Sequence, residues 1–306
     1  MITDSALAQE TAEVRALLRS TACRVDAALP DFLPRVSPYA GRLGPALAHT
    51  LSGGKRIRPL VVQQAAESCG LPAAAVLPTA CAFELLHTAT LIHDDLPAID
   101  NADLRRGLPA SHLAFGESTA ILAGDALIIA AFSAVARQAE RPETPPARVV
   151  RVVGEFARYS GAEGVIGGET ADIEGERQPP EAALLSYIHL HKTAVLFAAA
   201  ARAGAILAGA PEPVIASFGE YGEALGLLFQ VTDDLLDATG DAATLGKPAG
   251  LDAPAGKQTY PALLGLPGAQ TYAAELAEKV LTLAAALPAK REVWQGLVRV
   301  VLRREA

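Results

Sequence analysis

An acidic run closes a long apolar stretch in the first third of the sequence. "HDDLPAID" places Asp94, Asp95 and Asp100 after "VLPTACAFELLHTATLI", where Glu84 is the one acidic residue. Pro97 removes a backbone donor and crowds the preceding turn, so a helix should end or kink there. Such a break lets Asp100 fold back toward Asp94. Oxygen ligands with room for water suit Mg²⁺, which binds through one or two carboxylates plus substrate phosphates.

A second acidic run lies in another apolar stretch. "LGLLFQVTDDLLDATGD" contains Asp233, Asp234 and Asp237, and the first and last are four residues apart on one helical face. If the two runs faced each other, each pair of charges about 4 Å apart would repel by roughly 4 kcal/mol at an effective dielectric near 20. Divalent cations between the runs would reverse that sign. The two runs together therefore predict a magnesium site between two helices.

Basic residues accompany glycines or lie near the acidic runs at several places. "GGKRIRP" is not a Walker A loop, because the four-residue gap and the Ser/Thr after Lys are missing. Basic residues beside carboxylates and glycine turns favour phosphate recognition. His87 lies seven residues before Asp94, hence on the same side of a helix. The basic candidates in "GGKRIRP", "DLRRG", "HKT" and "LGKPAGLDAPAGK" are Lys55, Arg56, Arg58, Arg105, Arg106, Lys192, Lys247 and Lys257.

The elements that must position these groups are helices. Proline- and glycine-rich marks separate segments rich in Ala, Leu, Val and Glu at helical spacing, and no alternating strand pattern competes with them. We expect one all-α domain over residues 1–306, with a largely buried central layer of helices. The predicted helices cover 4–28, 44–69, 73–95, 117–138, 147–166, 181–209, 214–238, 258–264, 270–286 and 289–304.

Composition narrows the class of protein further. The net charge of −8 argues against nucleic acid or an anionic membrane surface as the main partner. Three cysteines without ligand spacing are expected to be small core residues of a reducing compartment, so we expect a cytoplasmic protein. Two apolar stretches contain Asp125 and Arg202 and are shorter than the roughly 20 apolar residues of a membrane span, so they are expected to be buried core helices.

With these motifs in this order, the chain resembles the trans-prenyl diphosphate synthases, the short-chain elongases such as farnesyl and geranylgeranyl diphosphate synthases. The resemblance runs from "LSGGKRIRP" to "KQTYPALLG" and includes "DDLPAID", "RRG", "HKT", "FQ", "DDLLD" and the "GK…GK" loop. It implies a bundle of long helices around a deep central cavity, usually a homodimer. It also implies that isopentenyl diphosphate is condensed with an allylic diphosphate (dimethylallyl, geranyl or farnesyl) in the presence of Mg²⁺, as three ions.

The resemblance assigns roles by position in these motifs. The implied Mg²⁺ ligands are Asp94, Asp100 and Asp233, with Asp237 as a further ligand and Asp95 and Asp234 in support. The implied groups for the allylic diphosphate are Arg105, Lys192, Lys247 and Lys257. Those for isopentenyl diphosphate are Gly54, Lys55, Arg58, His87 and Arg106. Thr193 and Gln230 correspond to residues whose oxygens face the developing allylic cation.

Two departures and one small residue bear on specificity. Asn101 follows the first run where many farnesyl synthases have further aspartates, and Glu169 in "GGETADI" replaces the usual Gln. Ala89 lies about 7.5 Å below Asp94 along a helix, where similar farnesyl synthases have a large aromatic. Room at Ala89 favours a twenty-carbon product, whereas Leu86 and Phe83, deeper in the cavity, would favour fifteen carbons by closing its floor.

Two other functions share parts of this pattern. A terpene cyclase would keep one Asp-rich motif and would not need the basic site of Lys55, Arg58 and His87. A non-catalytic subunit of a heteromeric synthase would tolerate loss of carboxylates. Both acidic runs and all three basic residues are present here, which disfavours each alternative.

Overall fold

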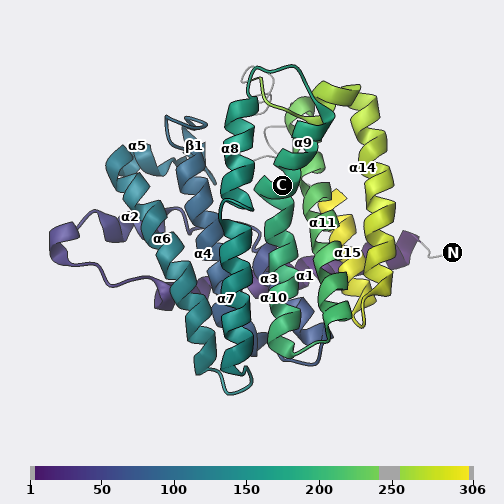
Figure 1. Ribbon diagram of the computed structural model, residues 1–306, viewed down its shortest axis with the longest axis horizontal. Coiled ribbons are helices and arrows are strands. Elements are labelled where there is room, and N and C mark those ends of the chain that lie inside the picture. Colours follow the sequence, from purple (N-terminus) through teal and green to yellow (C-terminus); the bar gives the residue numbers. More distant parts are fainter. Residues whose placement is uncertain (1–3, 241–255, 303–306) are drawn as a thin grey trace.

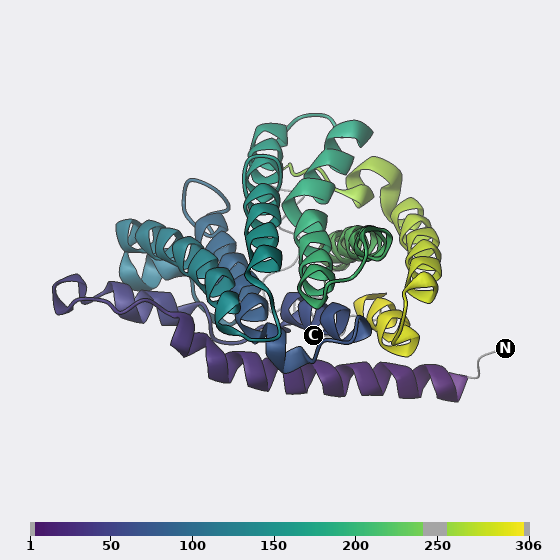
Figure 2. The ribbon, with the colours of Figure 1, turned by 60° about the horizontal axis from the view of Figure 1, so that its bottom comes forward.

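The computed structural model describes residues 4–240 and 256–302, and most of these lie in helices. The long helix α1 (Asp4–Ala28) runs along one side of a bundle formed by the other helices (Figures 1 and 2). The predicted all-α bundle is confirmed. A departure in the described part of the chain is a two-stranded antiparallel hairpin of β1 (Leu104–Arg105) and β2 (Leu108–Pro109), which was not predicted.

The predicted helix over 44–69 is two helices, α2 (Leu43–His49) and α3 (Ile57–Ser68). Between them Gly53 and Gly54 have φ angles of 75° and 101°, and Arg56 has a φ of 50°. Three left-handed residues in four positions are incompatible with a right-handed helix. The "GGKR" stretch is therefore a loop that presents its backbone and side chains at the start of α3.

The middle of the chain forms helices that lie beside the acidic run at Asp94. Helix α4 (Leu77–Asp94) packs against α6 (Glu117–Arg137), and the short α5 (Ser111–Phe115) precedes α6. The predicted helix over 147–166 is wrong at its C-terminal end, because α7 (Pro146–Ser160) stops and α8 (Val165–Gly175) begins anew. A Cβ atom at Gly164 would collide with the Tyr159 carbonyl, so this tight connection requires glycine. Helix α8 was not predicted.

The predicted helical stretch 181–209 is confirmed but is not uniform. It consists of α9 (Ala182–Ile188), a π-helical turn η5 (His189–Ala194) and α10 (Val195–Ala208). Helix α11 (Glu212–Thr239) follows, then α14 (Tyr260–Ala286) and α15 (Arg291–Leu302). Helix α14 is interrupted at Gly265, whose φ is 70°, between the two helices predicted there. Short 3₁₀ segments cover Leu29–Phe32, Pro38–Ala40, Ala73–Val76 and Gln138–Glu140.

Helix α10 lies at the centre of the bundle and packs against α3 and α11 (Figure 2). Its Ala- and Gly-rich sequence lets neighbouring backbones approach closely. A Cβ atom at Gly204 would collide with the Val62 carbonyl on α3, and one at Gly222 on α11 would lie 2.7 Å from the Phe197 carbonyl. Close packing without side-chain bulk explains how a chain with few aromatic residues forms a dense core.

Three helical stretches are long and apolar enough to cross a membrane by length and composition alone: Ala73–Asp94, Glu117–Glu140 and Ala182–Ala208. The first and third are 78% buried inside the bundle, as expected for core helices, but the second is only 44% buried. Asp125 lies on its exposed side. The expectation of a fully buried helix is therefore wrong for α6, which presents an apolar outer face.

The cysteines differ from expectation too. Cys81 is buried, but Cys69 is half-buried and Cys23 is exposed on the outer side of α1. The expectation of three core cysteines is correct for Cys81 and wrong for Cys23.

Candidate active site

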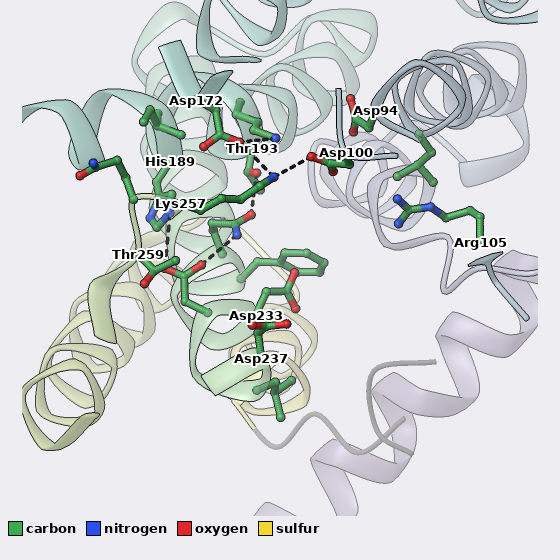
Figure 3. Close-up of a pocket in the computed structure, with 18 of the residues that line it drawn as sticks. Asp94, Asp100, Arg105, Asp172, His189, Thr193, Asp233, Asp237, Lys257 and Thr259 are labelled. Atoms are coloured by element: carbon green, nitrogen blue, oxygen red, sulfur yellow. Dashed lines mark hydrogen bonds and ion pairs between the residues drawn. The ribbon is translucent and has the colours of Figure 1, made fainter. Parts of the chain in front are cut away.

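Both acidic runs line one polar cavity of about 360 Å³ between α4, α8, η5 and α11 (Figure 3). Asp94 is the last residue of α4, Asp100 lies in the turn after it, and Asp233 and Asp237 come from α11. The predicted confrontation of the two runs is confirmed. A second cavity, of about 290 Å³ and lined by several charged side chains, adjoins the first, and Lys55, Leu91, Arg105, Phe229 and Asp233 line both.

The end of α4 positions the first acidic run. The helix stops at Asp94, and the backbone N–H of Asp100 donates to the carbonyl of Asp94 at 2.8 Å, as expected from the break at Pro97. The neighbouring Asp95 is buried and its carboxylate binds Arg105, whose Nε donates to Oδ1 at 3.0 Å. Asp95 therefore holds Arg105 in place, while Asp94 and Asp100 line the cavity.

The π-helical turn places Lys192 and Thr193 at the cavity. A π turn inserts an extra residue into a helix and is frequent at functional sites. The turn lies directly against α8, where a Cβ atom at Gly168 would collide with the backbone nitrogen of Lys192. Glycine at this position lets the next residue, Glu169, and Asp172 reach the Lys192 ammonium at 2.8 and 2.6 Å.

A second lysine continues this charged row. Lys257 Nζ lies 2.7 Å from Asp100 Oδ1 and 3.7 Å from Asp172 Oδ2. Its neighbour Gln258 is buried, accepts a hydrogen bond from the backbone N–H of Glu181 at 3.1 Å and donates to carbonyls at the end of α8. This anchors the chain beside Lys257. Carboxylates and ammonium groups thus alternate across the cavity, with Asp172 shared by both lysines.

Polar side chains of η5 and α11 form a connected row. Thr193 donates to Gln230 Oε1 at 2.8 Å, and Gln230 donates to Asp234 Oδ1 at 3.1 Å. The other carboxylate oxygen of Asp234 accepts from the backbone N–H of Tyr260 at 3.1 Å and lies 3.4 Å from His189 Nε2. Asp234 therefore ties α11 to α14 and η5.

Burial dominates the electrostatics of the cavity. Burial first, and then the Glu169 carboxylate, raise the pKa of Asp94 to about 8, against the opposing effect of Lys192. Burial would lower the pKa of Lys192, but Asp172 and Glu169 outweigh it, so the pKa of this ammonium is raised. Burial lowers the pKa of His189 to about 4, which leaves the imidazole neutral at pH 7. The cavity thus contains a carboxyl group, Asp94, that resists ionisation, beside a lysine, Lys192, that stays protonated.

All five residues predicted to bind isopentenyl diphosphate line the second cavity. They are Gly54, Lys55, Arg58, His87 and Arg106, joined by Arg105. Burial, and then Arg58 and the other nearby arginines, lower the pKa of His87 well below its ordinary value, so this imidazole is neutral. The cavity is strongly cationic and is suited to an anionic group.

A third cavity, of about 590 Å³, is mainly apolar and meets the first at Asp94. Leu86 and Thr90 line it from α4, and Ile128 and Phe132 from α6. Ala89 and Phe83 are fully buried and are not among the residues that line it. The Phe132 ring packs edge-on against Phe156 at 5.2 Å between centroids, and Phe156 packs the same way against Phe83 at 5.0 Å.

Several residues at these cavities were not predicted. Asp172 lies three residues after Glu169 and so on the same face of α8, a spacing that would have revealed it. His189 and Gln258 carry no such signal, because their roles arise from the π turn and from a contact distant in sequence. The implied diphosphate ligand Lys247 lies outside the described residues.

A family model described as polyprenyl synthetase matches residues 42–294. The chain belongs to the polyprenyl synthetase family. Accordingly it is a prenyltransferase. The prenyltransferase chain is 44% identical over 260 residues to geranylgeranyl pyrophosphate synthase 9 of Arabidopsis thaliana, covering 84% of this chain and 70% of the relative. It is 43% identical over 247 residues to the farnesyl diphosphate synthase of Geobacillus stearothermophilus, covering 80% and 82%.

A solved structure extends the comparison to the fold. The geranyltransferase of Helicobacter pylori, complexed with magnesium and isoprenyl diphosphate, superposes with a TM-score of 0.79 at 30% identity. The match covers 94% of this prenyltransferase and 96% of the other chain.

The raised pKa of Asp94 predicts a pH-dependent stability for the metal-free enzyme. The folded chain holds at Asp94, up to a pKa of about 8, a proton that the unfolded chain releases near 3.8. This contribution to the free energy of unfolding is complete below the unfolded pKa and is lost as pH rises through the folded pKa. We expect Asp94→Asn to reduce the fall in melting temperature between about pH 5 and about pH 8. The matched change at an exposed carboxylate, Glu220→Gln, should leave the profile unchanged. A profile for Asp94→Asn parallel to that of the wild type would contradict this prediction.

Proposed function

We propose that this prenyltransferase condenses isopentenyl diphosphate with an allylic diphosphate and releases geranylgeranyl diphosphate. The observation that carries the proposal is the position of Asp94, where the polar cavity with both acidic runs meets the large apolar cavity. A substrate with a charged head and a hydrocarbon tail matches this junction. The adjoining cationic cavity provides a separate site for a second diphosphate.

The residues at the first cavity fit Mg²⁺ delivered together with a diphosphate. The donors are carboxylate oxygens, which Mg²⁺ prefers. Among the described residues no three His, Cys, Asp or Glu side chains converge closely enough to hold a metal ion alone. Mg²⁺ commonly uses one or two carboxylates plus substrate phosphates, so such a cluster is not required. We assign Asp94, Asp100, Asp233 and Asp237 to a site for three Mg²⁺ ions.

The proposed chemistry is ionisation of the allylic C–O bond followed by attack of the isopentenyl double bond. Bound Mg²⁺ supplies positive charge that offsets the charge of the departing diphosphate. Lys192, Lys257 and Arg105 line the same cavity and orient that diphosphate. The Thr193 and Gln230 oxygens face the carbon that becomes cationic. A new carbon–carbon bond forms, a proton leaves the adjacent carbon for the released diphosphate, and the apolar walls exclude water that would trap the cation.

We infer the length of the product from the apolar cavity. We assign a twenty-carbon product because Ala89 on α4 has no aromatic side chain that could reach into the cavity. Phe132 is the aromatic residue that lines the cavity, and Phe156 and then Phe83 pack behind it. A fifteen-carbon product is the alternative. The two relatives described above are a geranylgeranyl and a farnesyl synthase, so both lengths occur at similar identity.

The outer face of α5 and α6 supports a homodimer. Leu113 is 56% exposed, Leu122 58% and Ile129 70%, and Ile121 lies beside them. Leu122 and Ile129 are seven residues apart and so share one side of α6. Large apolar side chains exposed on one side of a helix can mark an interaction surface. We propose that a second copy of the chain covers it.

The first experiment incubates the purified enzyme with Mg²⁺, isopentenyl diphosphate and each allylic diphosphate, and identifies the products. We expect prenyl diphosphates from the wild type. Asp94→Ala and Asp233→Ala should each lower kcat by at least about 100-fold, because loss of a group that stabilises charge in the transition state has effects of this size. Their helical circular dichroism should match the wild type. Absence of any prenyl product from the wild type, or wild-type rates in either variant, would refute the proposal.

The same assay tests product length. The wild type should release mainly the twenty-carbon product, and Phe132→Ala should shift the products to longer chains, because it removes a ring from the cavity lining. The matched truncation Phe218→Ala removes a buried ring that packs on Trp294 and is expected to lower stability without changing product length. A single fifteen-carbon product from the wild type would contradict the assignment.

The homodimer is tested by light scattering. We expect twice the chain mass for the wild type, the mass of one chain for the pair of changes Leu122→Asp and Ile129→Asp, and a retained dimer for Leu264→Asp on α14. Leu264 is 45% exposed, and α14, to which it belongs, lies away from α6 (Figure 1). A wild type that is monomeric at micromolar concentration would contradict the assignment.

A further inference from the structure

Glu84 is a buried carboxylate beside the cationic cavity, and the chemistry proposed above does not use it. It lies on α4 one turn before His87 and is only 2% exposed. A carboxylate at this depth is costly unless it is paired and hydrogen-bonded. Its partners are therefore informative about what it does.

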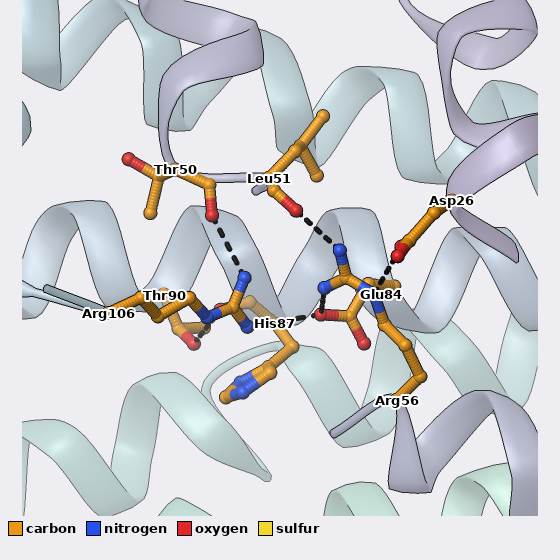
Figure 4. A network of polar contacts seen from close by, with 8 residues as sticks. All are labelled: Asp26, Thr50, Leu51, Arg56, Glu84, His87, Thr90 and Arg106. Atoms are coloured by element: carbon orange, nitrogen blue, oxygen red, sulfur yellow. Dashed lines mark hydrogen bonds and ion pairs between the residues drawn. The ribbon is translucent and has the colours of Figure 1, made fainter. Parts of the chain in front are cut away.

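One oxygen of Glu84 accepts from two arginines that come from different loops (Figure 4). Arg56 donates from its Nη1, and Arg106 donates from its Nη2 at 3.1 Å. Arg56 lies in the loop before α3 and Arg106 in the turn of the β hairpin, and both have left-handed backbones with φ angles of 50° and 54°. A left-handed conformation is unfavourable for a residue with a Cβ atom. The shared carboxylate thus fixes two strained loops against α4.

Arg56 is fully engaged in this network. Its Nε donates to Asp26 at 2.7 Å, its Nη1 to Glu84 and its Nη2 to the Leu51 carbonyl. All three guanidinium nitrogens therefore have protein partners, and the side chain is 1% exposed. The expectation that Arg56 is a phosphate ligand is corrected here, because these contacts make it a structural cation.

Arg106 is held differently. Its Nη1 donates to the Thr50 carbonyl at 2.9 Å and its Nη2 to Glu84, while the side chain lines the cationic cavity. A planar guanidinium fixed at two nitrogens has a defined orientation. Gly54 makes this arrangement possible, since a Cβ atom there would lie 2.8 Å from the Arg106 guanidinium carbon.

The charges that line the cavity explain why a carboxylate is needed between the two arginines. Five cationic side chains line it, Lys55, Arg56, Arg58, Arg105 and Arg106, together with only two carboxylates, Glu84 and Asp233. Two guanidinium groups sharing one oxygen would repel each other if that oxygen were uncharged. Glu84 offsets this repulsion from the side of α4 and leaves an excess of positive charge for an anionic ligand.

We propose that Glu84 is a positioning residue for the diphosphate of the second substrate, acting through Arg106. It sets the angle and depth at which Arg106, beside Lys55 and Arg58, meets the anion. The proposal rests on the proposed function, in which this cavity binds isopentenyl diphosphate.

The test is Glu84→Gln, which keeps the shape of the side chain and removes its charge. We expect KM for isopentenyl diphosphate to rise at least tenfold, while KM for the allylic substrate stays within twofold of the wild type. Calorimetric titration with inorganic diphosphate in the absence of Mg²⁺ should show the same loss of affinity at this cavity.

The chain offers a matched control. Glu155 on α7 also contacts two arginines: it accepts hydrogen bonds from Arg202 at 2.6 and 2.7 Å and lies 3.7 Å from Arg151. It lines none of the three cavities described above. Glu155→Gln should lower the melting temperature and leave both KM values unchanged. A purely structural role for Glu84 would give the same result in Glu84→Gln, and that result would overturn the proposal.

If Glu84→Gln does not fold, Glu84→Asp takes its place. The charge is kept but the carboxylate is withdrawn by one methylene, so KM for isopentenyl diphosphate should rise at least threefold, and an unchanged KM would overturn the proposal. Failure of the proposed function is recognised separately, because the wild type would then form no prenyl product. The diphosphate titration of wild type and variant would still test Glu84.

Discussion

The structure depends on holding many carboxylates close together at one cavity inside an apolar bundle. Asp94, Asp100, Asp172 and Asp233 all line one cavity, and in the apolar bundle around them like charges repel strongly. Two lysines inserted between the carboxylates compensate for this, and Asp172 contacts both of them. Burial and then the Glu169 carboxylate nevertheless raise the pKa of Asp94, against the opposing effect of Lys192. The cavity is therefore poised to accept additional positive charge, which agrees with the proposed role of Mg²⁺.

In the adjoining cavity the like charges that must be held together are positive instead of negative. There an excess of cations surrounds a single buried glutamate, and His87 remains neutral because burial and the arginines suppress its protonation. Two sites of opposite charge share one wall, formed by Lys55, Leu91, Arg105, Phe229 and Asp233. In the proposed function, this arrangement would separate two anionic substrates by the groups that neutralise them, metal ions for one and side chains for the other.

Much of this was predictable from sequence because the signals are local. The two acidic runs, the break after Asp94 and the return of Asp100 follow from residue type and spacing, and the structure contains all of them. The interruption between α2 and α3 was missed, although the glycine pair was noticed, because helical spacing continues on both sides. Helix α8 was missed, and its Gly168, which is unfavourable in a helix by propensity alone, is explained by the close contact with η5. Roles fixed by distant contacts, such as those of Gln258 and Arg56, leave no local pattern.

The π turn at His189–Ala194 has a consequence for the whole bundle. One additional residue per turn rotates everything after it by about 100° relative to a regular α-helix. Helix α10 follows directly, and its glycine and alanine side must face α3 and α11 for the backbones to fit. A single-residue deletion here would turn bulky side chains into those contacts while also moving Lys192 away from α8. The inserted residue thus determines the orientation of α10 about its axis and the direction of the Lys192 side chain at the same time. A change that alters one of them therefore alters the other.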